Sequence, residues 1–351
     1  MMQGTPWRRA SWSRAARRLA LLWCASGVVG FAGMQAGAWA GDRPVGPPER
    51  NIAEWLVRLQ QATRIHSYVG TFVVSSSSGA MSSARIWHAC EGDVQMERVD
   101  ALSGTPRTTL RRNELVVTVL PELRTMRTEQ REPVAVFPNL LTPGQDFSTA
   151  DFYGARQVGQ GRVAGFDADI VVLRPRDDRR FGYRIWSEKR TGLVVKTQTL
   201  DVAGRVLEQA AFSELQFDVP IDTDKLRRMM TGVDGYRKER SEHVSSTAQA
   251  EGWQLRETVP GFKSQHVYRR PAPGATSMVQ WIFSDGLATV SLFLEPYDAQ
   301  RHAQPGAAAL GATHTLSRRV PDTPRDWWVT AVGEVPPPTL QAFVDQLQRR
   351  N

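Results

Sequence analysis

Residues 68–99 read YVGTFVVSSSSGAMSSARIWHACEGDVQMERV, and this stretch decides the fold. It holds three runs rich in β-branched and aromatic side chains, namely Tyr68–Val74, Ala84–Cys90 and Val94–Val99. Ser78-Gly79 and Glu91-Gly92-Asp93 separate the runs, and these residue types favour tight turns because they tolerate the backbone angles that turns require. Short strands joined by tight turns predict an antiparallel meander.

The same pattern continues as far as Phe217. Further strand-like runs are Leu115–Leu120, Ile170–Leu173, Tyr183–Trp186, Leu193–Thr199 and Val206–Phe212. No helical stretch of the strand–helix–strand type separates them, so the sequence predicts an antiparallel sheet and not a parallel one. Residues 138–153 depart from the pattern, and we expect a loop there with a short helix near Asp146–Tyr153.

Residues 51–65 have the period of a helix. Ile52, Trp55, Leu56 and Leu59 recur at i, i+3, i+4 and i+7, which places them on one face that must be buried. A large antiparallel sheet needs cover for its apolar face. We therefore expect a half-barrel curled around this helix and around residues 138–153.

Two interiors are compatible with such a half-barrel. Incomplete cover would leave an apolar cavity for a lipid-like ligand, whereas complete cover would leave a packed core. The side chains expected to line such a cavity are Trp55, Leu59, Phe147 and Phe152. The sequence leaves both alternatives open.

The chain is expected to divide at a charged segment that is poor in apolar residues. We predict a linker at residues 218–248, with a solvated basic stretch at 237–240, between a first domain at 41–217 and a second domain at 249–351. The second domain holds the strand-like runs Gln265–Arg269, Met278–Ser284, Ala288–Leu294 and Trp327–Val332.

Two further signals organise the second domain. Ser284-Asp285-Gly286 predicts the turn of a hairpin between the second and third of these runs. A last helix, capped by Thr339, places Leu340, Phe343, Val344 and Leu347 on one apolar face. The predicted fold class is mainly β (α+β): a large curled antiparallel half-barrel sheet over helices, and a smaller antiparallel sheet domain with a C-terminal helix.

The N-terminus has the features of an export signal. Five arginines precede an apolar run from Leu19 to about Met34, which is too short and too rich in glycine to span a bilayer comfortably. Ala38-Trp39-Ala40 follows, so we expect signal peptidase to remove residues 1–40 and leave Gly41 first. An uncleaved anchor is the alternative. Loss of the five arginines lowers the formal net charge from +8 to +3, so the basic composition does not indicate nucleic-acid binding.

Cys90 would be the one cysteine of the mature chain, so no intramolecular disulfide is expected. His88 and Cys90 are one residue apart on a predicted strand and share a face, which we interpret as a structural pair because no further ligands lie nearby. Asp177-Asp178, flanked by arginines, is interpreted as a solvated hairpin tip. No catalytic, cofactor-binding or metal-binding motif is recognised, so we predict a binding protein, with an envelope hydrolase as an alternative.

Aromatic side chains gather in the second domain. Trp327 and Trp328 are adjacent on a predicted strand, so their rings should point to opposite faces. One ring can fill the core, and the other would face solvent, a linker or a partner. Trp281, Phe283, Trp327 and Trp328 are therefore the predicted partner-binding residues.

An ordered set of short motifs spans most of the predicted mature chain. In the first domain these are Tyr68–Val73, Gly92-Asp93 with Glu97-Arg98, Arg162–Gly165, Phe181–Trp186, Thr191–Leu193 and Leu207–Gln209. In the second domain they are Ser284–Ala288 and Val332–Pro336. This set resembles the MucB/RseB family, although a solitary cysteine at position 90 is not expected across that family.

The resemblance implies a periplasmic negative regulator of the sigma-E envelope-stress pathway. Such a protein would bind the periplasmic part of a membrane-spanning anti-sigma factor and shield it from proteolysis. The larger domain would resemble the lipoprotein carrier LolA, and the smaller one would contribute strongly to anti-sigma binding. Release would follow binding of mislocalised lipopolysaccharide or lipoprotein. The resemblance implies no catalytic residue or cofactor. A periplasmic lipid or lipoprotein carrier is the alternative, and homo-oligomerisation is left open.

Overall fold

The computed structural model describes residues 52–130, 137–141, 149–240, 243–272, 275–302 and 304–350, without the side chains at 271, 272, 275 and 276. The predicted export signal, its cleavage site at Ala40/Gly41 and the predicted cavity residue Phe147 lie outside these residues. Two main sheets make up the described chain, and the prediction of a mainly β protein with a larger and a smaller sheet is confirmed.

The larger sheet has twelve strands in the order β12-β6-β5-β4-β3-β2-β1-β11-β10-β9-β8-β7. Their bounds are β1 Tyr68–Ser76, β2 Met81–Glu91, β3 Val94–Ala101, β4 Thr108–Arg112, β5 Leu115–Leu120, β6 Thr125–Gln130, β7 Tyr153–Val163, β8 Phe166–Pro175, β9 Gly182–Glu188, β10 Val194–Leu200, β11 Val206–Phe217 and β12 Arg237–Arg240. Neighbouring strands are antiparallel, as predicted, apart from one pair. β12 runs parallel to β6 at the sheet edge, which the turn pattern could not predict because the two strands are distant in sequence.

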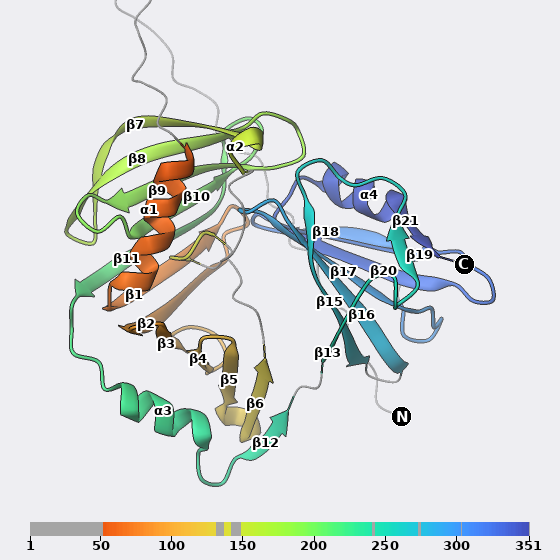
Figure 1. The fold of residues 1–351 in the computed structure, drawn as a ribbon, viewed down its shortest axis with the longest axis horizontal. Helices are drawn as coiled ribbons and strands as arrows, with labels where there is room; N and C mark the ends of the chain where they lie inside the picture. Colours follow the sequence, from red (N-terminus) through yellow and green to blue (C-terminus); the bar gives the residue numbers. More distant parts are fainter. Residues whose placement is uncertain are drawn as a thin grey trace, which may run out of the picture. The chain divides into compact units, whose positions relative to one another are not determined.

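The helix α1 (Ile52–Ile65) crosses the strands of this sheet (Figure 1). Trp55, Leu56 and Leu59 are buried in a core with apolar side chains of β7 to β10, so the predicted buried face is confirmed. The short helix α2 (Thr149–Phe152) leads directly into β7, and a 3-10 turn, η1 (Pro121–Leu123), joins β5 to β6. No helix in the described part of the chain is long and apolar enough to cross a membrane.

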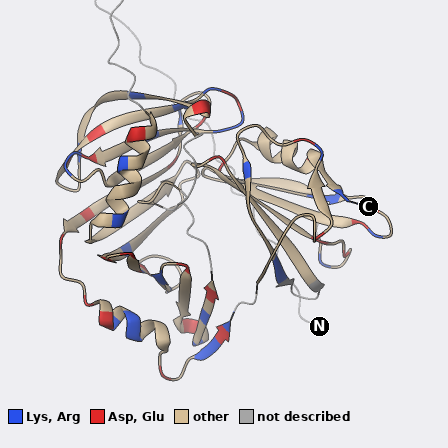
Figure 2. Cartoon of the chain, in the orientation of Figure 1, with Lys and Arg blue, Asp and Glu red and all other residues tan. Residues whose placement is uncertain are grey.

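The predicted linker is built of short elements that join the two sheets. The helix α3 (Thr223–Thr231) is capped by Asp222, whose side chain accepts from the Lys225 backbone N–H. Leu226 of α3 is buried against β3 and β4. The chain then adds β12 to the larger sheet and β13 (Val244–Ser246) to the smaller one. Figure 2 shows acidic and basic residues along α3 and on β12.

The smaller sheet has seven strands in the order β13-β15-β16-β17-β20-β19-β18. Their bounds, besides β13, are β15 Lys263–Ala272, β16 Ala275–Ser284, β17 Thr289–Pro296, β18 Gly306–Leu310, β19 Thr313–Val320 and β20 Trp327–Gly333. The predicted hairpin is confirmed as β16 and β17. The hairpin of β18 and β19 was not predicted. A separate pair joins β14 (Trp253–Leu255) to β21 (Leu347–Arg349).

The last helix, α4 (Pro337–Gln346), covers the core of the smaller sheet with Leu340, Phe343 and Val344. The prediction that Thr339 caps this helix is wrong. The helix begins earlier, after Pro336, because proline fixes the backbone angle that a first turn needs. Thr339 therefore lies inside the first turn, where its hydroxyl is free to bond elsewhere.

Candidate functional site at the junction of the two sheets

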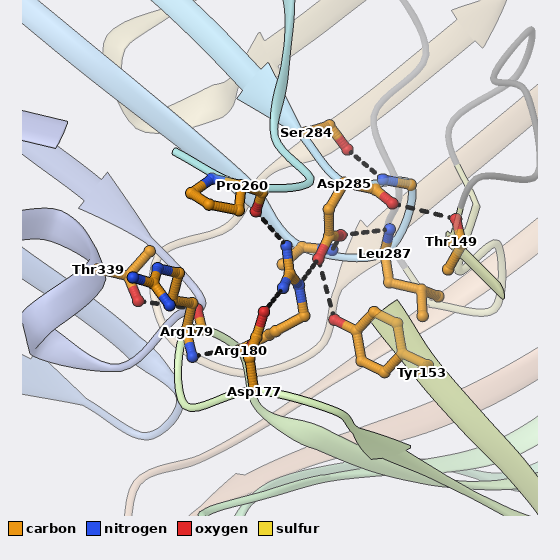
Figure 3. A network of polar contacts seen from close by, with 12 residues as sticks. Thr149, Tyr153, Asp177, Arg179, Arg180, Pro260, Ser284, Asp285, Leu287 and Thr339 are labelled. Atoms are coloured by element: carbon orange, nitrogen blue, oxygen red, sulfur yellow. Dashed lines mark hydrogen bonds and ion pairs between the residues drawn. The ribbon is translucent and has the colours of Figure 1, made fainter. Parts of the chain in front are cut away.

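An ion pair between Arg180 and Asp285 lies at the centre of the contact between the sheets (Figure 3). Arg180 comes from the turn between β8 and β9, and Asp285 from the turn between β16 and β17. Their Nε and Oδ2 atoms are 2.7 Å apart, and both side chains are fully buried. An unpaired charge at such depth would be costly, so each residue depends on the other.

The remaining donors of Arg180 are also used. Its guanidinium bonds to the Asp177 carboxylate and donates to the Pro260 carbonyl oxygen at 2.7 Å. The Phe152 and Phe262 rings cover it, with centroids 4.4 and 5.1 Å from the guanidinium carbon. Burial by itself lowers the pKa of Arg180, but the charge and hydrogen bond of Asp285 raise it, so the side chain stays charged.

Both carboxylate oxygens of Asp285 also accept hydrogen bonds. The Tyr153 hydroxyl donates to its Oδ2 at 3.1 Å, and the backbone N–H groups of Leu287 and Ala288 donate to its Oδ1 at 3.0 and 2.7 Å. Burial, and then the charge of Asp285, raise the pKa of Tyr153 well above its usual value, so the phenol stays neutral and donates. The Thr149 hydroxyl donates to the Asp285 carbonyl oxygen at 3.0 Å.

Two further contacts complete this set. The Thr339 hydroxyl donates to the Arg179 carbonyl oxygen at 2.8 Å, which fixes α4 to the turn that carries Arg180. Leu287 joins the core formed by α1 and β7 to β10. We call Thr149, Tyr153, Arg180, Asp285 and Thr339 the junction clamp. Each of its side chains bonds across the junction, which suits the holding of two domains better than acid–base chemistry.

A groove of about 830 Å³ adjoins the junction clamp, and we call it the junction groove. Phe152 of α2 lines one side of it, and Trp253, Phe262, Trp281 and Phe283 of the second domain line the other. The Trp281 Nε1–H donates to the Ser264 hydroxyl at 2.8 Å. An apolar groove with a few fixed polar groups suits an extended peptide or an apolar chain.

The four predicted partner-binding residues separate into two places. Trp281 and Phe283 line the junction groove. Trp327 and Trp328 point to opposite faces of β20, as predicted, and neither lines the groove. Trp327 packs edge-on against Trp253, with ring centroids 5.1 Å apart.

The expectation that the ring not in the core would face solvent, a linker or a partner is wrong. Trp328 stacks on His302 with ring centroids 5.0 Å apart, and Tyr297 lies beside it. Its exposed fraction is 6%. The segment after β17 folds back and covers the ring, which strand parity could not predict.

Trp55 and Leu59, predicted to line a lipid cavity, lie in the packed core beneath α1. Phe152 is only partly buried and lines the junction groove. The structure therefore brings Phe152 together with Trp281 and Phe283, from the other predicted set, and separates it from Trp55 and Leu59. A role of these residues in lipid binding stays a prediction.

His88 and Cys90 share a face of β2, as predicted, and the Cys90 Sγ lies 3.3 Å from His88 Nε2. His88 also contacts the Thr63 carbonyl oxygen at 2.8 Å and the Glu97 carboxylate at 3.5 Å. Burial lowers the pKa of His88, but contacts with Cys90 and Glu97 raise it to about 9. In the described residues, no group of three His, Cys, Asp or Glu side chains could hold a metal ion.

The sequence pattern did not indicate a buried pair of Arg180 and Asp285. The interpretation of Asp177 and its neighbours as a solvated hairpin tip is wrong in part, because Arg180 turns inward and pairs there with the Asp177 carboxylate. Asp178 is exposed, as expected. One signal was available: Ser284-Asp285-Gly286 stands between two strongly apolar runs, where a charge needs a partner.

Two family models match the chain. Residues 51–230 match the MucB/RseB N-terminal domain, and residues 247–348 match the MucB/RseB C-terminal domain. Together they cover most of the chain, in the same order as the two sheets.

Relatives and solved structures agree with these matches. The chain is 31% identical over 294 residues to the sigma factor AlgU regulatory protein MucB of Pseudomonas aeruginosa, covering 82% of this chain and 87% of that protein. It is 23% identical over 299 residues to the sigma-E factor regulatory protein RseB of Escherichia coli K12, covering 84% and 89%. A crystal structure of MucB in complex with MucA(peri) has a TM-score of 0.66 and 26% identity, covering 85% of this chain and 98% of that one.

Proposed function

The chain belongs to the MucB/RseB family, and from this membership we propose that it restrains a sigma-E-type factor by binding the periplasmic part of a membrane-spanning anti-sigma factor. Two observations carry the proposal: both family domains match in order, and MucB bound to MucA(peri) has the same fold. The predicted export signal supports a periplasmic location.

The junction groove is the proposed binding surface for the anti-sigma factor. It is walled by large aromatic side chains from the second domain, and buried aromatic anchors contribute most to protein–protein binding. Trp281 has its indole N–H already bonded to Ser264, so its ring is held in one orientation before binding. A fixed ring loses little entropy when a peptide packs on it.

Binding in this groove would protect the anti-sigma factor from proteolysis. A protease must hold its substrate in an extended form with both edges accessible. A segment packed between Phe152 and the second domain would have one side covered. The anti-sigma factor would then be cleaved only after release.

We propose that an envelope lipid or lipoprotein signal causes this release. A ligand shifts an equilibrium only if it favours one arrangement over the other. The junction clamp is the element that such a ligand would have to open or distort. The packed core under α1 favours a regulator over the alternative, a carrier that holds a whole acyl chain in its resting form.

A protection assay tests the regulator directly. The purified chain without residues 1–40 is mixed with the periplasmic fragment of its anti-sigma factor, and cleavage by the cognate protease is followed over time. We expect cleavage to slow in proportion to the bound fraction, and added lipopolysaccharide to restore it. Unchanged cleavage at saturating protein would refute the regulator, and stoichiometric transfer of a bound acyl chain to an acceptor would favour the carrier.

A further inference from the structure

A second, smaller cavity lies apart from the junction groove. Its volume is about 170 Å³, and we call it the acidic pocket. Phe72 of β1, with Phe137 and Leu140, lines part of its wall, and Leu287 of the second domain lines another part. These parts of the wall are apolar, so they can pack against the hydrocarbon part of a side chain.

Two carboxylates line the same pocket. Glu208 comes from β11 of the larger sheet, and Glu334 follows β20 of the smaller one. Among the residues that the structure describes, neither carboxylate has a salt-bridge partner. Glu208 accepts a hydrogen bond from the Ala312 backbone N–H and is half-buried, whereas Glu334 remains accessible to solvent. Two like charges thus face one small space without a cation.

A hydroxyl group without a partner also lines the pocket. The Thr197 hydroxyl of β10 has no hydrogen-bond partner among the described residues. Tyr183 of β9 is 6% exposed and lines the same pocket, and its hydroxyl bonds to the Tyr153 side chain. A buried hydroxyl without a partner is costly, so Thr197 indicates a site that a polar ligand completes.

We propose that the acidic pocket receives one lysine or arginine side chain from the anti-sigma factor. This inference rests on the proposed function and names a chemical feature of the partner. Such a side chain has an apolar stem and a charged end, which match the apolar walls and the two carboxylates. The volume is below the roughly 300–1,000 Å³ of pockets that take drug-sized ligands, so it suits a single side chain.

A divalent cation fits the pocket less well. Calcium takes about six to eight oxygen ligands, and magnesium keeps several waters in a near-octahedral shell. Glu208, Glu334 and the hydroxyl groups supply oxygens on one part of the wall, but the part formed by Phe72, Phe137 and Leu287 supplies none. A lysine or arginine side chain can place its stem against the apolar wall and its charged end at the carboxylates.

The electrostatics of the pocket make binding dependent on pH. Loss of solvation next to the surrounding protein, and then the charge of Glu208, raise the pKa of Glu334 to about 7. The remaining contact of Glu334 with solvent screens part of this shift. Burial also raises the pKa of Glu208. Asp285 and Arg180 also act on Tyr183 of the pocket wall, and these two charges neutralise each other. A cation binds the ionised carboxylates, so affinity should rise from pH 6 to pH 8.

Calorimetric titration with the anti-sigma periplasmic fragment tests the proposal. We compare the wild-type chain with Glu334→Gln and Glu208→Gln at pH 6 and pH 8, with Glu122→Gln at an exposed, distant turn as the matched control. Because a charge pair at a partly exposed site is lost, we expect each pocket variant to bind roughly tenfold more weakly at pH 8. Glu334→Gln should also lose the pH dependence, and the control should keep both properties.

A charge exchange identifies the bound side chain. Glu334→Lys should weaken binding further, and one Lys→Glu or Arg→Glu change in the fragment should restore it. If both glutamine variants bind as tightly as the wild type at both pH values, the proposal is wrong, while the regulator stands because the fragment still binds. If the fragment does not bind the wild-type chain at all, both the pocket proposal and the regulator proposal are wrong. Binding that requires added calcium, and loses this requirement in the variants, would assign a metal instead and overturn the proposal.

Discussion

At the scale of single residues, Arg180 joins parts of the chain that are far apart in the sequence. Its guanidinium meets Asp177, Asp285 and Pro260, and none of its surface is exposed. The partners come from both sheets, so this one side chain ties distant parts of the chain together. Arg180 stabilises the fold only if Asp285 is present, because both charges are buried and each compensates the other.

The first prediction concerns this dependence. Arg180→Met leaves the Asp285 carboxylate buried without its cation and should lower the free energy of unfolding by about 3–5 kcal/mol. Adding Asp285→Asn should recover a large part of this loss, because no uncompensated charge remains. Urea unfolding of the wild type, both single variants and the double variant measures the coupling. Strictly additive effects would show that the pair does not act as a unit.

Gly261 shows how closely Arg180 is enclosed. Its φ is +83°, and a Cβ atom there would meet the Arg180 guanidinium and the Phe152 ring. Gly235 has a similar φ of +78° and nothing within 4 Å of such a Cβ. Both alanine variants carry the backbone cost of about 1–2 kcal/mol. Gly261→Ala should lower the melting temperature clearly more than Gly235→Ala, and equal shifts would argue against a tight enclosure.

His88 predicts a pH dependence of stability. Its folded pKa of about 9 lies above the value near 6.5 expected in the unfolded chain. The folded protein therefore holds more protons between these values, so the stabilisation is complete below pH 6.5 and is lost as the pH rises through 9. We expect wild-type stability to fall across this range relative to His88→Gln. Parallel curves for both proteins would show that His88 is not charged in the fold.

At the scale of elements, α3 shows that a charged segment can still hold a structural helix. Only Leu226 of this helix is buried, and it packs with Met96 and Leu110 of the larger sheet. Met229 and Met230 pack against the same core but are only partly buried, so the apolar period of the helix is short. These contacts and the Asp222 cap hold the helix, and β12 holds the chain beyond α3 to the sheet edge.

The prediction for α3 concerns its one buried side chain. Leu226→Ala should cost about 2–5 kcal/mol of stability, as expected when a buried leucine is truncated. Leu123→Ala removes a leucine that is 69% exposed and should change stability by less than about 0.5 kcal/mol. Chemical unfolding of both variants makes the comparison. A small effect at position 226 would mean that α3 is not anchored to the sheet.

At the scale of the whole molecule, the junction clamp and the junction groove lie next to each other. Phe152 covers Arg180 in the clamp and also lines the groove. A ligand in the groove therefore touches a side chain that helps to hold the two sheets together. Opening the clamp would change the groove, and this coupling is what a regulator released by a signal requires.

The prediction at this scale separates the two tryptophan sites. Trp281→Ala should weaken anti-sigma binding by at least about tenfold and shorten the protection from proteolysis, because it removes an aromatic anchor from the groove. Trp327→Ala removes a ring that packs on Trp253 outside the groove and should affect stability more than affinity. Affinity is measured at a temperature where both variants are folded. Equal losses would place the binding surface elsewhere.

Sequence by itself determined the local structure of this protein. The alternation of apolar residues and turn signals from Tyr68 to Phe217 predicted antiparallel strands, and the period of residues 52–59 predicted the buried face of α1. Both rest on contacts between near neighbours in the chain, where side-chain spacing decides which face is covered. The hairpin around Ser284-Asp285-Gly286 was predicted for the same reason.

Only the tertiary structure decided which charged side chains are buried and which partners they meet. Arg180 and Asp285 are 105 residues apart, and β6 and β12 are more than 100. No local pattern distinguishes an arginine at a solvated tip from one that is buried, because the difference lies in whether a carboxylate arrives from another sheet. Glu208 and Glu334 meet in the acidic pocket in the same way. Burial of a charge is settled by partners that folding brings together, so it follows from the assembled molecule and not from the sequence around each residue.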